Sequence, residues 1–93
     1  MMLMNEAPPA IVATLPLPTV TSTGDELFRM GLLYSTGQGG APLDYVSAHM
    51  LFNLAAMRGS VEAKVYRKEL SQEMASEDVA EAQRQAREWL AHG

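Results

Sequence analysis

Small residues recur at helix-contact spacing along residues 27–59, and this feature restricts the possible fold more than any other. Gly31, Ala48, Ala55 and Ala56 stand where two helices would touch. Larger apolar side chains fill the positions between them: Leu27, Met30, Tyr34, Leu51 and Phe52. A glycine-rich loop separates the two halves. Because small side chains let helix axes approach closely, the pattern predicts a helical hairpin that stacks on a copy of itself.

The chain as a whole is expected to be all-α, with about four helices in two antiparallel hairpins. The helices are predicted at about residues 24–35, 44–58, 60–74 and 77–91. Thr23 or Asp25 can cap the first helix, Asp44 the second and Ser60 the third, and Gly59 suits the left-handed position after the second. In the last two helices we expect burial of Val61, Ala63, Tyr66, Leu70, Met74, Val79, Ala82, Ala86, Trp89 and Leu90.

The glycines have two different predicted roles. Gly31 lies inside a helix, where glycine costs about 1 kcal/mol relative to alanine, so we expect another backbone to come close there. The loop with Gly37, Gly39 and Gly40 superficially resembles a phosphate-binding loop. No strand precedes it and no lysine follows its glycines. These glycines are therefore expected to supply positive φ angles where the chain reverses.

Residues 1–23 are predicted to form an extended, proline-rich arm ahead of a helical domain at residues 24–93. The domain divides into a hairpin at 24–59 and capping helices at 60–93. Proline disfavours helix at its own position and at the preceding residue, and the arm contains Pro8, Pro9, Pro16 and Pro18. The arm is also apolar, so two interpretations stay open: a floppy tail, or a segment that lies in a groove of this chain or of a neighbour.

Composition argues against several classes of function. A net charge of −4 without a basic stripe argues against nucleic acid as a partner. The lack of cysteine excludes disulfides and thiolate metal sites. His49 and His92 stand far apart without acidic companions at ligand spacing, so we expect no metal and no cofactor. There is no apolar run of about 18 residues and no positively charged signal region, so we expect a cytoplasmic protein without membrane contact.

A spaced set of glycine, alanine and aromatic residues runs through the first hairpin into the third helix: Gly31, Tyr34, Gly37, Gly39, Asp44, Ala48, Leu51, Phe52, Ala55, Ala56, Gly59 and Ala63. This set resembles the Sel-one-like repeat, a relative of the tetratricopeptide repeat, and the likeness covers about residues 25–91. The later segment A-E-A-Q-R-Q-A-R-E-W resembles the closing helices of some bacterial members. Three features depart from the family pattern: one extra residue in the Gly37–Asp44 loop, Leu51 in place of tryptophan, and Lys68 in place of a helix-contact glycine.

The resemblance implies a fragment of a right-handed α-solenoid, of about one and a half repeats plus a C-terminal capping helix, that serves protein–protein contact. The family shares no catalytic residues, so none is assigned. Solenoid units need about three repeats to bury their apolar faces. We therefore expect the outer side of the first hairpin to be covered by the 1–23 arm, by a second copy of the chain or by a partner protein.

The expected function is that of a non-catalytic adaptor that binds a peptide or protein segment through its helical surface. The candidate contact residues are Arg29, Tyr34, His49, Met50 and Asn53. Core packing is the commoner role for a tyrosine at position 34, and a solvated helix position is the commoner role for a histidine at position 49. The alternative is a self-associating structural module, a homo-oligomer. An enzyme is not expected, because Ser47 and His49 lie two residues apart on one helix and so do not face each other.

Overall fold

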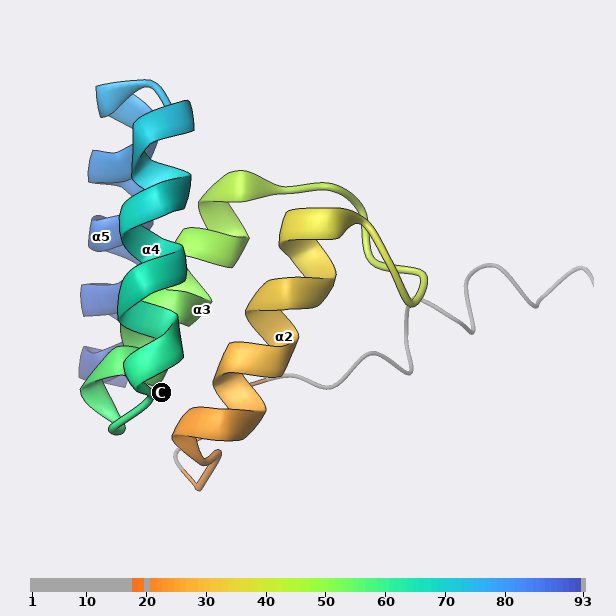
Figure 1. The fold of residues 1–93 in the computed structure, drawn as a ribbon. Coiled ribbons are helices and arrows are strands. Elements are labelled where there is room, and N and C mark those ends of the chain that lie inside the picture. Colours follow the sequence, from red (N-terminus) through yellow and green to blue (C-terminus); the bar gives the residue numbers. More distant parts are fainter. Residues whose placement is uncertain (1–17, 20, 93) are drawn as a thin grey trace, which may run out of the picture.

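The computed structural model describes residues 18, 19 and 21–92. This part of the chain contains four helices and no strand: α2 (Gly24–Thr36), α3 (Tyr45–Met57), α4 (Val61–Glu73) and α5 (Ser76–His92) (Figure 1). The all-α prediction is confirmed, and each helix begins and ends within one residue of its predicted bounds. Most of the predicted arm, residues 1–17 and 20, lies outside the described residues, so both interpretations of the arm stay open.

Side-chain caps explain where three of the helices begin. The Thr23 hydroxyl accepts the Glu26 backbone N–H at 3.0 Å, and the Glu26 carboxylate accepts the Thr23 N–H at 2.8 Å, which completes a capping box. Asp44 accepts the Ser47 N–H at the start of α3, and Ser60 caps α4 in the same way. Thr23 rather than Asp25 is therefore the first cap, and the predictions for Asp44 and Ser60 are confirmed.

Glycines with positive φ end the first two helices and shape the loop between them. Gly37 has φ of 71° and donates its N–H to the Leu33 carbonyl, and Gly59 follows α3 with φ of 95°. Gly39 and Gly40 also have positive φ. The expectation that these glycines allow the chain to reverse is confirmed.

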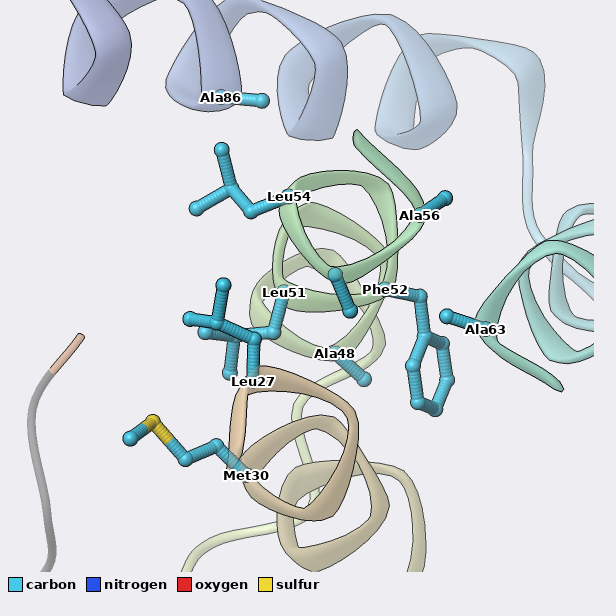
Figure 2. Close-up of a cluster of buried hydrophobic side chains, with 10 residues drawn as sticks. Leu27, Met30, Ala48, Leu51, Phe52, Leu54, Ala56, Ala63 and Ala86 are labelled. Atoms are coloured by element: carbon cyan, nitrogen blue, oxygen red, sulfur yellow. The ribbon is translucent and has the colours of Figure 1, made fainter. Parts of the chain in front are cut away.

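Helix α3 lies at the centre of the fold and contacts each of the other three helices. Figure 2 looks along α3 and shows α2, α4 and α5 around it, with the side chain of Leu54 toward Ala86 of α5 and the ring of Phe52 toward Ala63 of α4. The core residues are Leu27, Met30, Ala48, Leu51, Phe52, Leu54, Ala55, Ala56, Ala63 and Ala86. The residues of α3 that were predicted at the helix contact are all buried: Ala48, Leu51, Phe52, Ala55 and Ala56.

Gly31 marks a close approach, as predicted, but its neighbour is a side chain. A Cβ atom at position 31 would stand 2.5 Å from Cε1 of Phe52, which is far inside van der Waals contact. The expectation of a neighbouring backbone is therefore wrong. Glycine is needed because the Phe52 ring lies directly against the helix at that point.

Three burial predictions for the last two helices are wrong. Val61 is 69% exposed, Tyr66 is 42% exposed and Leu90 is about half exposed. On α4, Ala63 contacts the core, and Val61, two residues earlier, lies on the opposite side of the helix. Tyr66, three residues after Ala63, contacts Phe28 and Phe52 but remains covered on one side only. Helical periodicity identified apolar positions but did not show which of them a neighbouring helix covers.

Candidate functional site

Three of the predicted contact residues lie on separate parts of the surface. Arg29 is exposed on α2, forms an ion pair with Asp25 and borders a depression of about 640 Å³ beside Thr19 and Ser22. Tyr34 is half-buried and packs against the core. Met50 lies in a different, shallow depression next to residues of α5. The structure does not bring these three side chains together, and their role in partner contact stays a prediction.

The other two predicted residues, His49 and Asn53, both face α4. His49 is only 1% exposed, and its Nε2 lies 2.8 Å from the Ser71 hydroxyl. Asn53 Oδ1 accepts a hydrogen bond of 2.6 Å from the Arg67 guanidinium. The expectation that His49 is a solvated helix residue is therefore wrong, because its ring bridges α3 and α4 in the interior. These two side chains are engaged in joining the helices.

The hydrogen-bond network around His49 indicates a neutral ring. The Ser71 hydroxyl donates to the Arg67 carbonyl at 2.8 Å, so it accepts from His49 Nε2–H. Nδ1 is buried and has no hydrogen-bond partner among the described residues. Burial lowers the pKa of His49, and the nearby charge of Arg67 lowers it further. His49 is therefore a neutral residue of the helix interface.

An aromatic cluster lies between α2 and α4, which flank α3 (Figure 1). Phe28 of α2, Phe52 of α3 and Tyr66 of α4 contact one another, with ring centroids 5.1 Å apart for Phe28–Tyr66, 5.7 Å for Phe52–Tyr66 and 5.8 Å for Phe28–Phe52. The Phe28–Tyr66 pair is edge-to-face, a favourable arrangement for aromatic rings. The cluster therefore connects α2 and α4, each of which also packs on α3.

Next to this cluster is an open groove, which we call the α2–α4 groove. It has a volume of about 200 Å³ and is lined by Ser35, Tyr45, Phe52, Tyr66, Glu69, Leu70 and Glu73. Glu69 and Glu73 are exposed, and neither forms an ion pair with another described residue. No lysine or arginine is among the described lining residues. The groove thus combines aromatic side chains with a negatively charged rim.

This groove was not predicted by the sequence analysis, although the spacing of residues along α4 indicates it. Tyr66, Glu69, Leu70 and Glu73 are spaced by three and four residues and so share one face of α4. The burial prediction used Tyr66 and Leu70 as core positions and assigned no role to Glu69 and Glu73. Two carboxylates on the same face as the aromatic and leucine side chains are the feature that could have indicated an open groove.

Ser47 and His49 are hydrogen-bonded to other residues, and the described part of the chain holds no cluster of metal-ligating side chains. The Ser47 hydroxyl donates to Asp44 at 2.7 Å and so belongs to the cap of α3, while His49 bonds to Ser71. No group of three or more histidine or acidic side chains in this part of the chain could hold a metal ion. None of the described helices has the length and apolar character needed to cross a membrane.

Comparison with known proteins gives no assignment. No family model, no curated protein and no solved structure matches this chain.

Proposed function

We propose that this chain is a non-catalytic protein-interaction module whose α2–α4 groove binds a segment of another protein. The observation that carries the proposal is the position of Tyr66, which is 42% exposed and yet in ring contact with Phe28 and Phe52. Aromatic side chains held rigidly in a concave apolar surface with a polar rim are typical anchors of protein interfaces. Folding buries one side of this cluster, and a partner would bury the other.

The packing of the first hairpin supports placing the module among helical repeats. Gly31 accommodates the ring of Phe52, and small residues of α3 lie buried at the helix contacts. The Sel-one-like resemblance rests on these positions. We propose that the helices form a short α-solenoid of antiparallel hairpins, in which α2 and α4 are neighbouring first helices of two units. In that arrangement a groove between first helices is a natural place for a bound segment.

A peptide-display selection tests this function without knowledge of the natural partner. The full chain is immobilised and used to select peptides from a random library, and the affinity of enriched peptides is measured for wild type, Tyr66→Ser and Leu90→Ser. Leu90 is a matched control, because it is a similarly exposed apolar residue on α5. We expect Tyr66→Ser to weaken binding at least tenfold and Leu90→Ser to leave it unchanged, with both variants shown to be folded by circular dichroism. Equal binding by wild type and Tyr66→Ser, or no enrichment, would contradict the proposal.

A further inference from the structure

The outer face of α4 has an exposed stripe of alternating apolar and basic residues, which we call the α4 stripe. It consists of Val61, Lys64, Val65 and Lys68, spaced so that all four lie on one side of the helix. Val61 is 69% exposed and Val65 is 52% exposed, and both lysines are exposed. Neither lysine forms an ion pair within the described part of the chain. Solvent-exposed valines between unpaired cations are a candidate contact surface.

The α4 stripe and the α2–α4 groove are different faces of one helix. At about 100° per residue, the centre of the stripe lies roughly 140° around α4 from the centre of the side that carries Tyr66, Glu69, Leu70 and Glu73. The two surfaces adjoin at Val65 and Glu69, which stand four residues apart. Ala63, which is fully buried, stands three residues before Tyr66 and seven before Leu70, so the groove side of α4 adjoins the side that meets the core. One molecule therefore offers both an acidic, aromatic groove and a basic, apolar stripe.

We propose that the α2–α4 groove of one copy binds the α4 stripe of a second copy. This proposal uses the same groove as the proposed function and names one occupant for it. Val65 would contact Tyr66 and Leu70 of the neighbouring copy, and Lys64 and Lys68 would face Glu69 and Glu73 across the rim. An amphipathic helix laid into an apolar groove is a common recognition mode, and opposite charges at the rim fix its register.

Charge distinguishes this occupant from the chain's own N-terminal segment. Residues 1–17 contain no lysine or arginine, so no cationic side chain of this segment could pair with the two rim glutamates. The stripe supplies two cations with the same spacing as the two carboxylates. Lys64 and Lys68 stand four residues apart, as do Glu69 and Glu73. Charge complementarity therefore favours a second copy over the arm.

Because the groove and the stripe are different surfaces, the contact joins unlike faces of two identical molecules. Such heterologous contacts form rings when the rotation closes and open chains when it does not. The expected behaviour is an average molar mass that rises continuously with protein concentration and falls with added salt, since the rim pairs are exposed to solvent.

Charge reversal with complementation tests the proposal. The first variant carries Glu69→Lys and Glu73→Lys, and the second carries Lys64→Glu and Lys68→Glu. We expect each variant alone to associate at least tenfold more weakly than wild type in sedimentation equilibrium. An equimolar mixture should associate again, because the intact stripe of the first variant meets the intact groove of the second. The matched control, Asp78→Lys with Glu88→Lys, reverses two acidic residues of α5 away from the groove and should associate at least as well as wild type.

Cysteine crosslinking gives a second readout, because the chain contains no native cysteine. Val65→Cys mixed with Ser35→Cys should give an intermolecular crosslink, and Leu90→Cys mixed with Ser35→Cys should not. A wild-type chain that stays monomeric at all concentrations, or a mixture of charge variants that does not recover association, would overturn the proposal. If selected peptides still require Tyr66 in that case, the groove binds another protein. If they do not, the proposed function fails as well.

Discussion

At the scale of single residues, the contact between Gly31 and Phe52 decides how closely α2 and α3 approach. The ring of Phe52 is held by Phe28 and Tyr66 on its open side and lies near Ala63, so it has little room to move. Gly31→Ala would place a Cβ atom 2.5 Å from this ring. Overpacking of this kind costs roughly 1–3 kcal/mol, and a contact as short as this one falls in the part of that range above the gain of about 1 kcal/mol in helix propensity.

We therefore expect Gly31→Ala to lower the free energy of unfolding, measured by urea titration. The double variant Gly31→Ala with Phe52→Leu provides the control. A smaller side chain at position 52 relieves the contact, so that the added methyl should cost less in this background than in wild type. A Gly31→Ala variant as stable as wild type would mean that the ring shifts freely, and the close-packing argument for this glycine would be wrong.

His49 makes the stability of the fold depend on pH. Its ordinary pKa is 6.5, and burial followed by the charge of Arg67 lowers it in the folded chain. Just below pH 6.5 the unfolded chain therefore binds a proton that the folded chain does not. Since stability rises with pH wherever the unfolded state binds more protons, the free energy of unfolding should fall as the pH drops below 6.5.

Urea titrations between pH 7.5 and 5 measure this dependence. In His49→Gln the decline over that range should be much smaller than in wild type, whereas His92→Gln, which changes an exposed histidine of α5, should retain it. Glu81, whose pKa is lowered from 4.5 to about 2 by its hydrogen bonds to Arg84 and Gln85, affects stability mainly below this pH range. If the free energy of unfolding of His49→Gln declined as much as that of wild type, His49 would not be the cause of the pH dependence.

At the scale of helices, the capping box fixes the start of α2. Thr23→Ala removes the hydroxyl that accepts the Glu26 N–H, and loss of such a cap costs about 1 kcal/mol. We expect a lower melting temperature for Thr23→Ala, while Thr23→Ser should behave like wild type because it keeps the hydroxyl. If Thr23→Ala and Thr23→Ser had the same melting temperature, below that of wild type, the hydroxyl would not be the stabilising group.

Helix limits were predictable from the sequence because their causes are local. Thr23, Asp44 and Ser60 each satisfy a backbone N–H a few residues away, and Gly37 and Gly59 supply positive φ just beyond a helix. The open surfaces were not predictable in the same way, since exposure depends on which neighbour covers a helix face. Helical periodicity therefore placed Val61 and Tyr66 correctly on a helix and wrongly in the core.

The interior position of His49 was also beyond the sequence pattern. Its burial depends on Ser71, which is 22 residues away along the chain and meets the ring only after α4 packs on α3. The α2–α4 groove has the same origin, because its lining residues Ser35, Phe52 and Tyr66 come from three helices. Contacts between distant segments thus determine the candidate site, whereas local signals determine the helices that form it.

At the scale of the whole molecule, the central position of α3 should make the fold cooperative. Helix α3 contacts α2, α4 and α5, so no other helix keeps its buried face if α3 unfolds. Phe52→Ala removes a buried ring from the junction of α2, α3 and α4, at a cost of roughly 3–5 kcal/mol. For a domain of this size such a loss approaches the total stability.

Two probes can show whether the molecule unfolds as one unit. The protein has a single tryptophan, Trp89, which packs against the core from α5, so that its fluorescence reports on a helix remote from the Phe52 ring. Far-UV circular dichroism reports on all the helices. We expect both signals to give the same midpoint in wild type, and Phe52→Ala to lower both midpoints equally. If the fluorescence midpoint stayed at its wild-type value while the dichroism midpoint fell, α5 would be stable without the α2–α3–α4 junction, and α3 would not couple the whole fold.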